Sequence, residues 1–310
     1  MVVISPRYHA VSIAAVFLAL AVGVVLGASG LSDRLLTAVS AERDDLAGQV
    51  QALTAERDAL AVTARVADEF AGRIGPGAVR GVLDGRTVVL VTAGADPADR
   101  DAVAGLVRTA GGEVTGEVAL TDAVGDPVRG DQLRELAARL LPAGAQLPAA
   151  ADTGTLAGGL LGSVLVAGPD RPRAGPEDGA AVLSGLATAG FVTPGTAPAP
   201  ASLVVVLTGG ARTGVDAGDS AAVLARLAAE LDRAGGGVVL AGRAGSATST
   251  GAVGIARSDS AVAAGVSTVD DVHTGSGRVA AVLALREQVD GRAGHYGSAE
   301  GADGGAAPAA

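Results

Sequence analysis

A short acidic turn near the end of the chain brings together residues that can bind a divalent metal ion. Asp270, Asp271 and His273 supply two carboxylates and one imidazole, and His295 is the next histidine along the chain. Imidazole nitrogens and carboxylate oxygens are ligands for Zn²⁺ and Cu²⁺. The spacing lacks the i,i+4 or paired-histidine pattern of known metal motifs, so a solvated acidic turn is the competing interpretation. The solvated turn is the first of these two interpretations, and a metal site at Asp270, Asp271 and His273 is the second.

Common catalytic groups are missing from the sequence. The chain contains no cysteine, which excludes thiolate nucleophiles, disulfides and cysteine metal sites. It contains a single methionine, Met1, so the thiolate and thioether ligands that copper(I) prefers are nearly absent. No serine stands in a G-x-S-x-G arrangement before a predicted helix. We therefore expect a protein that is not an enzyme and has no resident cofactor.

The segment Gly275-Ser-Gly-Arg-Val-Ala280 fits the G-x-G-x-x-A pattern of dinucleotide-binding turns. That pattern also needs a strong strand before it and an acidic residue about 20 positions later. Here the preceding run, Val266–Val272, is interrupted by Asp270 and Asp271, and the tail of the chain lies where the acidic residue should be. We expect instead a helix start capped by Ser276.

Arg212 and Arg243 each follow a predicted strand, in Thr208-Gly-Gly-Ala-Arg212 and Ala241-Gly-Arg243. Ligands of open parallel sheets bind beyond the carboxyl ends of the strands, so a crevice there would use these arginines to bind an anion. Small residues in strand-to-helix turns accompany every fold of this type. Purely structural turns are therefore the first of two alternatives, and an anion site at Arg212 and Arg243 is the second.

The elements that must position these residues alternate between strands and helices from Arg80 onward. The segments Val88–Gly112 and Val204–Gly237 repeat one strand–helix–strand pattern. Such units require a parallel sheet with right-handed crossovers and helices on both faces. We predict a Rossmann- or flavodoxin-like α/β domain over residues 80–296 and a disordered tail over residues 297–310. The predicted strands are Thr87–Thr92, Glu113–Leu120, Leu160–Ala167, Leu203–Thr208 and Val238–Ala241, and the predicted helices are Pro97–Ala110, Asp131–Leu141, Glu177–Ala189, Asp219–Ala234 and Gly277–Val289.

An uncharged apolar run from Ala10 to Leu31 precedes that domain. A helix of this length crosses a hydrocarbon layer about 30 Å thick and exceeds the apolar part of most signal peptides. A membrane anchor is the first interpretation, and a signal sequence cleaved after Ala28-Ser29-Gly30 is the second. Arg7 precedes the run, so the positive-inside rule keeps residues 1–9 in the cytoplasm and exports the rest. The anchor residues are Ala10, Phe17, Leu18, Leu20, Leu26 and Leu31.

A helix with a heptad pattern is predicted over residues 32–74. Arg43 and Arg57 share its seam, each within the sequence Ala-Glu-Arg-Asp, which recurs two heptads later. A sustained 3.5-residue repeat is typical of coiled coils, so we expect a homo-oligomer; one amphipathic helix packed on its own domain is the alternative. Gly75-Pro76-Gly77 is expected to end the helix. The apolar seam residues are Leu36, Val39, Leu46, Val50, Leu53 and Leu60.

The charge of the chain limits its partners. The formal net charge is −10, and no basic block is present. An acidic chain of this kind is a poor ligand for phosphate backbones, which excludes nucleic-acid binding as its role. The expected partners are the membrane, further copies of the chain and other envelope proteins.

The two ends of the chain are similar to one known family. The similar segments are Arg7–Gly27, Ser267–Val272, Gly277–Ala280, Leu283–Gln288 and Gly294–Gly297. With the order of anchor, heptad helix and α/β domain, they resemble the actinobacterial copper transport protein family, MctB. The resemblance implies a role in keeping intracellular copper low by efflux through the outer envelope, with copper as the transported ion and an outer-membrane location.

The predicted strands differ from those of a membrane barrel. Lipid-facing barrels need strands of about ten residues that alternate apolar and polar side chains, whereas the runs here are short and uniformly apolar. We therefore expect an oligomeric component of copper transport, or an envelope scaffold that affects copper only indirectly.

Overall fold

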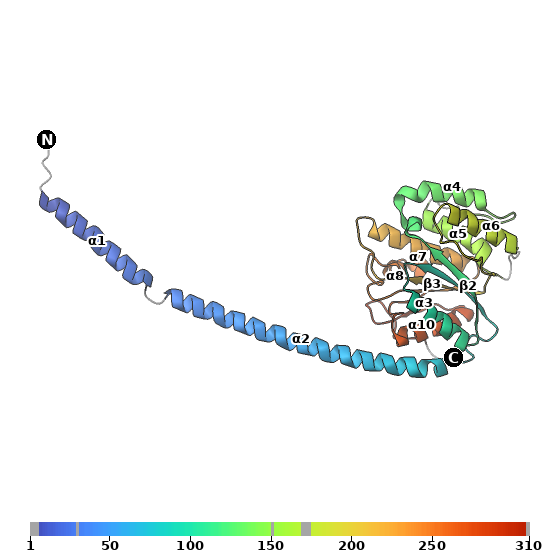
Figure 1. Cartoon of the computed structure of the whole chain (residues 1–310), viewed down its shortest axis with the longest axis horizontal. Helices are drawn as coiled ribbons and strands as arrows, with labels where there is room; N and C mark the ends of the chain where they lie inside the picture. The colour runs from blue at the N-terminus through green and yellow to red at the C-terminus, as the bar shows by residue number, and fades with distance from the viewer. Residues whose placement is uncertain (1–5, 29–30, 150–151, 169–174, 308–310) are drawn as a thin grey trace. The chain divides into compact units, whose positions relative to one another are not determined.

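The computed structural model of the chain describes residues 6–28, 31–149, 152–168 and 175–307 (Figure 1). The contacts within it separate two compact units, Met1–Val66 and Ala67–Ala310. The first unit holds helix α1 (Pro6–Ala28) and most of helix α2 (Leu31–Ala78). The second holds the last turns of α2 and a helix-flanked sheet.

Helix α1 exposes every side chain from Arg7 to Val25. Its segment Arg7–Val25 is long and apolar enough to cross a membrane, and none of it is buried. Among the described residues this is the one helix with that property. A signal sequence near an N-terminus also passes this test of length and composition, so the cleaved alternative stays open.

Helix α2 runs past the point where the sequence predicted its end. It continues through Gly75-Pro76-Gly77 to Ala78, so the predicted stop at these residues is wrong. A proline removes one N–H and crowds the preceding turn. Gly75 and Val79 are buried against the domain, and this packing holds the last turn helical despite Pro76.

All the strands of the second unit pair in parallel in one sheet. The order is β2-β1-β3-β4-β5-β6, and its first five positions follow the flavodoxin-like arrangement. The α/β fold with a parallel sheet is confirmed. The strands are β1 (Thr87–Ala93), β2 (Glu113–Leu120), β3 (Leu203–Thr208), β4 (Gly237–Ala241), β5 (Ser267–Val269) and β6 (His295–Tyr296).

Helices cover both faces of this sheet, as predicted. Successive side chains of a strand point to opposite faces, so Val89 and Val91 join one apolar core while Val88 and Leu90 join the other. The first core also takes residues of α4 to α8, and the second takes residues of α3 and α10. The helices are α3 (Pro97–Thr109), α4 (Gly130–Leu140), α5 (Thr153–Leu165), α6 (Pro176–Thr188), α7 (Ala217–Arg233), α8 (Ala252–Ser258), α9 (Ser260–Ala263) and α10 (Gly275–Val289), with 3₁₀ turns η1 (Asp122–Gly125) and η2 (Pro127–Arg129).

The predicted strand Leu160–Ala167 is wrong, because Leu160–Leu165 belongs to helix α5 and Val166 forms only an isolated bridge to Ala201. A short apolar run bounded by glycines fits a buried strand or a buried helix equally well by periodicity. The glycines decide between them. A Cβ on Gly158 would lie 2.8 Å from the carbonyl oxygen of Leu227, so only glycine lets α5 pack directly on the backbone of α7.

The predicted disorder of the tail is also wrong as far as the structure describes it. The N–H of Gly297 donates to the carbonyl of Gly304 at 2.9 Å, and Ala307 is buried in the core on the α10 side. Composition suggested too little apolar surface for folding. Backbone hydrogen bonds from Ser298 and Ala299 to the Asp270 carboxylate hold the segment instead. Residues 308–310 lie outside the described residues.

Candidate functional site

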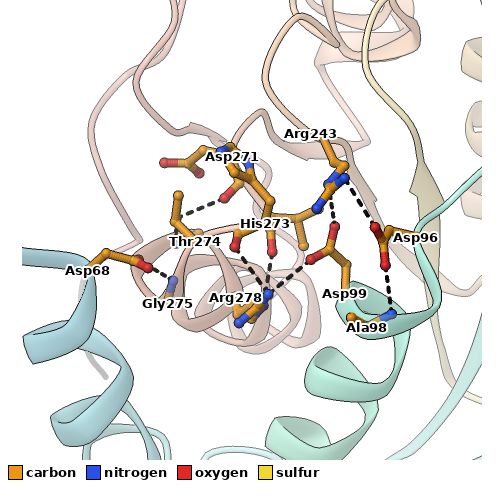
Figure 2. Close-up of polar contacts among 12 residues, drawn as sticks. Asp68, Asp96, Ala98, Asp99, Arg243, Asp271, His273, Thr274, Gly275 and Arg278 are labelled. Carbon is orange, nitrogen blue, oxygen red and sulfur yellow. Dashed lines mark hydrogen bonds and ion pairs between the residues drawn. The ribbon is translucent and has the colours of Figure 1, made fainter. Parts of the chain in front are cut away.

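The carboxyl ends of β1, β4 and β5 bring Arg243 and the predicted acidic turn together with Asp96. Asp96 follows β1, Arg243 follows β4, and the acidic turn Asp270–His273 follows β5. This is the edge where open parallel sheets bind their ligands. Figure 2 shows Asp96, Arg243, Asp271 and His273 with the start of α10.

Asp99 is the centre of an ion-pair network at this edge. It lies in the first turn of α3, is 2% exposed, and contacts two arginines. Its carboxylate lies 2.7 Å from Nε of Arg243 and 2.9 Å from Nη2 of Arg278 (Figure 2). Arg243 also pairs with Asp96 at 3.2 Å, and Asp96 caps α3 by accepting from the N–H of Ala98 at 2.8 Å. Each buried charge therefore has an opposite charge beside it.

The two predicted anion-binding arginines are both paired with carboxylates. Arg243 contacts Asp96 and Asp99, and Nη1 of Arg212 lies 3.3 Å from the Asp122 carboxylate. The N–H of Arg212 donates to the carbonyl of Thr250 at 3.0 Å. These contacts favour the alternative that the strand-end turns are structural. Pro169 and Asp170, from a further predicted strand end, lie outside the described residues.

The Asp270 carboxylate is bonded to groups other than its predicted metal-binding partners. It is 2% exposed and forms a buried ion pair with Arg257 at 2.8 Å. The same carboxylate accepts hydrogen bonds from the N–H groups of Ser298 and Ala299. Its oxygens therefore serve to fix the C-terminal segment against β5.

Asp271 and His273 each have a buried polar atom that makes no hydrogen bond within the described residues. Oδ1 of Asp271 and Nδ1 of His273 are buried without a hydrogen-bond partner among the described residues. Burial raises the pKa of the Asp271 carboxyl, and the neighbouring Asp270 carboxylate raises it further. His295 lies on β6, where Nδ1 of its ring is 3.0 Å from Oγ1 of Thr268 and burial lowers its pKa.

The described residues hold no group of three or more histidine, cysteine or acidic side chains suited to a metal ion. Asp270, Asp271 and His273 are therefore not gathered into one set of ligands. Metal binding at these residues stays a prediction.

The turn Thr274–Gly277 begins α10 and differs from the prediction in its capping residue. Thr274 is the N-cap, with its hydroxyl accepting from the N–H of Gly277 at 2.9 Å, whereas Ser276 lies 3.1 Å from that hydroxyl. The expected cap at Ser276 is wrong by two positions. The Asp68 carboxylate of α2 accepts from the N–H of Gly275.

The predicted anchor and seam residues whose side chains the structure describes are exposed on the two helices. Ala10 is exposed on α1, as are the larger side chains Phe17, Leu18 and Leu20. Along α2 the exposed seam residues are Val39, Leu46, Val50, Leu53 and Leu60. Leu26, Leu31 and Leu36 lie in the helices, but their side chains are outside the described residues, as are Ser29 and Gly30 of the possible cleavage site. The coiled coil concerns a second copy of the chain and stays a prediction.

Two cavities lie away from the strand-end network. One of about 570 Å³ is lined by β2, α6 and the segment after Val192, and one of about 330 Å³ lies among η2, α4 and α7. Asp270, Asp271, His273, Arg212 and Arg243 line neither cavity.

Sequence reasoning missed Asp99 and Arg257. In the sequence, Asp99 is one of several acidic residues at the start of an amphipathic helix. Acidic side chains are common there and are usually exposed to solvent, so this one gave no distinct signal. Arg257 belongs to the short helix α8, for which no pattern was seen. Only the tertiary fold makes either residue central.

Comparison with known proteins gives one consistent similarity. A family model described as "Copper transport outer membrane protein, MctB" matches residues 3–307. A protein named copper transporter MctB from Mycobacterium tuberculosis strain H37Rv is 42% identical over 307 residues, which covers 96% of this chain and 98% of that protein. A protein of the same name from Mycobacterium leprae strain TN is 41% identical over 310 residues, with the same two shares.

Proposed function

Because the chain belongs to the MctB family of copper transport outer membrane proteins, we propose that it is a membrane-anchored component of copper transport in the cell envelope. The observation that carries this proposal is the match to the family over nearly the whole chain. The exposed apolar helix α1 supports membrane attachment. The proposed role is to keep intracellular copper low without enzymatic chemistry.

The proposed topology places the α/β domain outside the cytoplasm. Arg7 is the one basic side chain before the apolar part of α1. The positive-inside rule then keeps the short N-terminus in the cytoplasm and exports α2 and the domain. The net charge of −10 over the whole chain suits a protein that works without nucleic-acid partners.

Copper in this proposal is cargo that the chain helps to move. The composition supports this, because the sequence has no cysteine and only Met1 as a thioether, whereas copper(I) prefers soft sulfur ligands. A pathway for the ion would then come from several copies or from partner proteins. On α1, a Cβ added at Gly23 or Gly27 would meet no atom within 4 Å, so these positions are open to close helix packing.

Self-association through α2 is the proposed route to such an assembly. The seam residues Val50, Leu53 and Leu60 are exposed in the single chain at heptad spacing. A second copy would cover this seam, and Arg43 and Arg57 at a-type positions would fix register and number of helices at some cost in stability.

An envelope scaffold with an indirect effect on copper is the second candidate function. The paired charges around Asp99 and Arg243 support it, because these strand-end cations are already neutralised by the domain's own carboxylates. A scaffold would act through α2 and its partners rather than through a ligand site.

The copper content of a strain lacking the gene tests the proposal. A transport component predicts higher intracellular copper in the deletion strain than in the parent during growth on added copper. Complementation with the intact chain should restore the parental level. Equal copper content in the deletion and parent strains would contradict a transport role.

Planar-bilayer recording on the purified full-length chain separates a component from a self-sufficient channel. A component predicts no discrete conductance from this chain alone. Discrete copper-permeable conductances from the pure protein would contradict the need for partners.

A further inference from the structure

The last turns of α2 and the start of α10 meet at a contact that we call the joint: Asp68, Gly72 and Gly75 on α2, with Gly275 and Val279 on α10. Asp68 is bonded to the N–H of Gly275. A Cβ on Gly275 would lie 2.8 Å from the nitrogen of Gly72 and 2.9 Å from the carbonyl oxygen of Asp68. A Cβ on Gly75 would collide with Val279. The two helices therefore touch through their backbones.

The joint explains the G-x-G-x-x-A pattern of residues 275–280. In dinucleotide-binding turns the first glycines let a phosphate approach the start of the helix. Here the helix start is approached by the end of α2, and the Asp68 carboxylate takes the position of the anion. The partial positive charge of the helix N-terminus favours that carboxylate.

The first turn of α10 connects the joint to Arg278, and ion pairs then lead from Arg278 to the ends of β1 and β4 (Figure 2). Arg278, one turn beyond Gly275, donates to the carbonyls of Val272 and His273 at 3.2 and 3.1 Å and pairs with Asp99. Asp99 pairs with Arg243, which pairs with Asp96. The path thus joins α2, α10, α3 and the loop after β4.

Burial makes this path sensitive to the position of α10. Asp99 is almost fully buried and is shared by Arg278 and Arg243. A shift of the α10 start that moves Arg278 would leave a buried carboxylate with one partner, which is strongly unfavourable. The loops that carry Asp96 and Arg243 would then have to rearrange.

We propose that the joint is a conformational coupling device, in which the contact of Asp68 and Gly72 with Gly275 sets the order of the loops at the carboxyl ends of β1 and β4. The end of α2 thereby controls the edge of the sheet where a ligand would bind. This inference rests on the domain's own contacts and is independent of copper transport.

Hydrogen exchange followed by mass spectrometry on the full-length chain in detergent tests the joint. Asp68→Asn removes the charge while keeping the side-chain shape, and Gly275→Ala forces the helices apart. The matched controls are Glu69→Gln, on the exposed neighbouring residue, and Gly77→Ala, where an added Cβ meets no atom within 4 Å. Exchange is read in residues 272–279, 94–100 and 242–247, with β3 as the internal reference.

The proposal predicts exchange at least tenfold faster in all three segments for Asp68→Asn and Gly275→Ala, with β3 and both controls unchanged. Faster exchange confined to residues 272–279 would overturn it, because the contact would then be only a helix cap. An equal effect of the controls would overturn it as well. If Gly275→Ala also speeds exchange in β3, that variant reports unfolding and Asp68→Asn decides.

A path-breaking variant tests the route itself. In an Arg278→Gln background, Asp68→Asn should no longer change exchange in residues 94–100 and 242–247, since the link between them has been cut. Coupling claims need this kind of double-variant comparison. A persisting effect of Asp68→Asn in that background would contradict the route through Arg278 and Asp99.

Discussion

The two compact units of the chain differ in the exposure of their large apolar side chains. Phe17 on α1 is 67% exposed, whereas Phe191 in the α/β domain is fully buried. Leu53 on α2 is 64% exposed, whereas Leu240 on β4 is fully buried. Large apolar surfaces left in water are costly and mark interaction sites. The domain therefore carries its own core, and we infer that the first unit finds its apolar contacts outside the chain, in lipid and in a second copy.

The largest effect is expected from charged residues on α1, which should abolish its attachment to the membrane. Leu18→Arg combined with Leu20→Arg adds about 5 to 7 kcal/mol to the cost of membrane insertion, which cancels the gain from the apolar run. The double variant should leave the membrane fraction when cells are fractionated without detergent. Val128→Arg, at an exposed apolar residue of the domain, is the control and should stay with the membrane. Retention of the double variant in carbonate-washed membranes would contradict an anchor.

Truncating a buried leucine of the sheet should destabilise the domain while the matched change on α2 should not. Leu240→Ala is expected to cost about 2 to 5 kcal/mol because it leaves a cavity in the core. Leu53→Ala removes an exposed side chain and should change the stability of the domain by less than about 0.5 kcal/mol. The free energy of opening, measured by hydrogen exchange in β3 and β4 of the full chain, compares the two variants. Equal losses would contradict the separation of the units.

Polar substitutions in the α2 seam test whether its exposed apolar residues mediate self-association. Leu46→Asn combined with Leu60→Asn should weaken self-association of the full-length chain at least tenfold, since polar side chains in a seam destabilise coiled coils. Ala55→Asn, outside the seam, is the control. Sedimentation velocity in detergent measures the association. An unchanged distribution of sedimentation coefficients in the double variant would contradict a coiled coil through α2.

The smallest expected effect concerns Asp232, a half-buried acid of the domain. Burial raises the pKa of Asp232 to about 6, from an ordinary value of 3.8. The folded state therefore binds more protons than the unfolded state between these pH values, and this contribution to stability is lost as pH rises through about 6. Asp232→Asn should make the domain slightly more stable than the parent at pH 7 and should reduce the difference at pH 4.5. Thermal unfolding at the two pH values checks this, and a pH-independent difference would be the contrary result.

The sheet and most helices could be predicted because local pattern and tertiary role agree there. The strands beginning at Thr87, Glu113, Leu203 and Val238 were placed to within one residue, since β-branched runs between glycine-rich turns fit a buried parallel strand. Helix α5 was mistaken for a strand because its glycines serve packing on α7, which no local pattern reveals. The end of α2 and the folded tail depend in the same way on distant contacts.

The strand-end network could be predicted only in its parts. Arg243 was singled out from its place after a strand, but its partner Asp99 had no signal beyond a helix start. The acidic turn was noticed as possible metal chemistry, whereas Asp270 is held by Arg257. Arg243 and Asp99 lie more than one hundred positions apart in the chain, so their pairing depends on the order of the strands in the sheet. Local sequence patterns do not give that order.

The rate of copper efflux tests the central claim most directly. Cells lacking the gene, preloaded with copper and transferred to copper-free medium, are compared after complementation with the intact chain or with the Leu18→Arg, Leu20→Arg variant. A membrane-anchored transport component predicts that the intact chain restores rapid efflux and that the variant does not. Equal efflux in all three strains, or full restoration by the unanchored variant, would contradict the account.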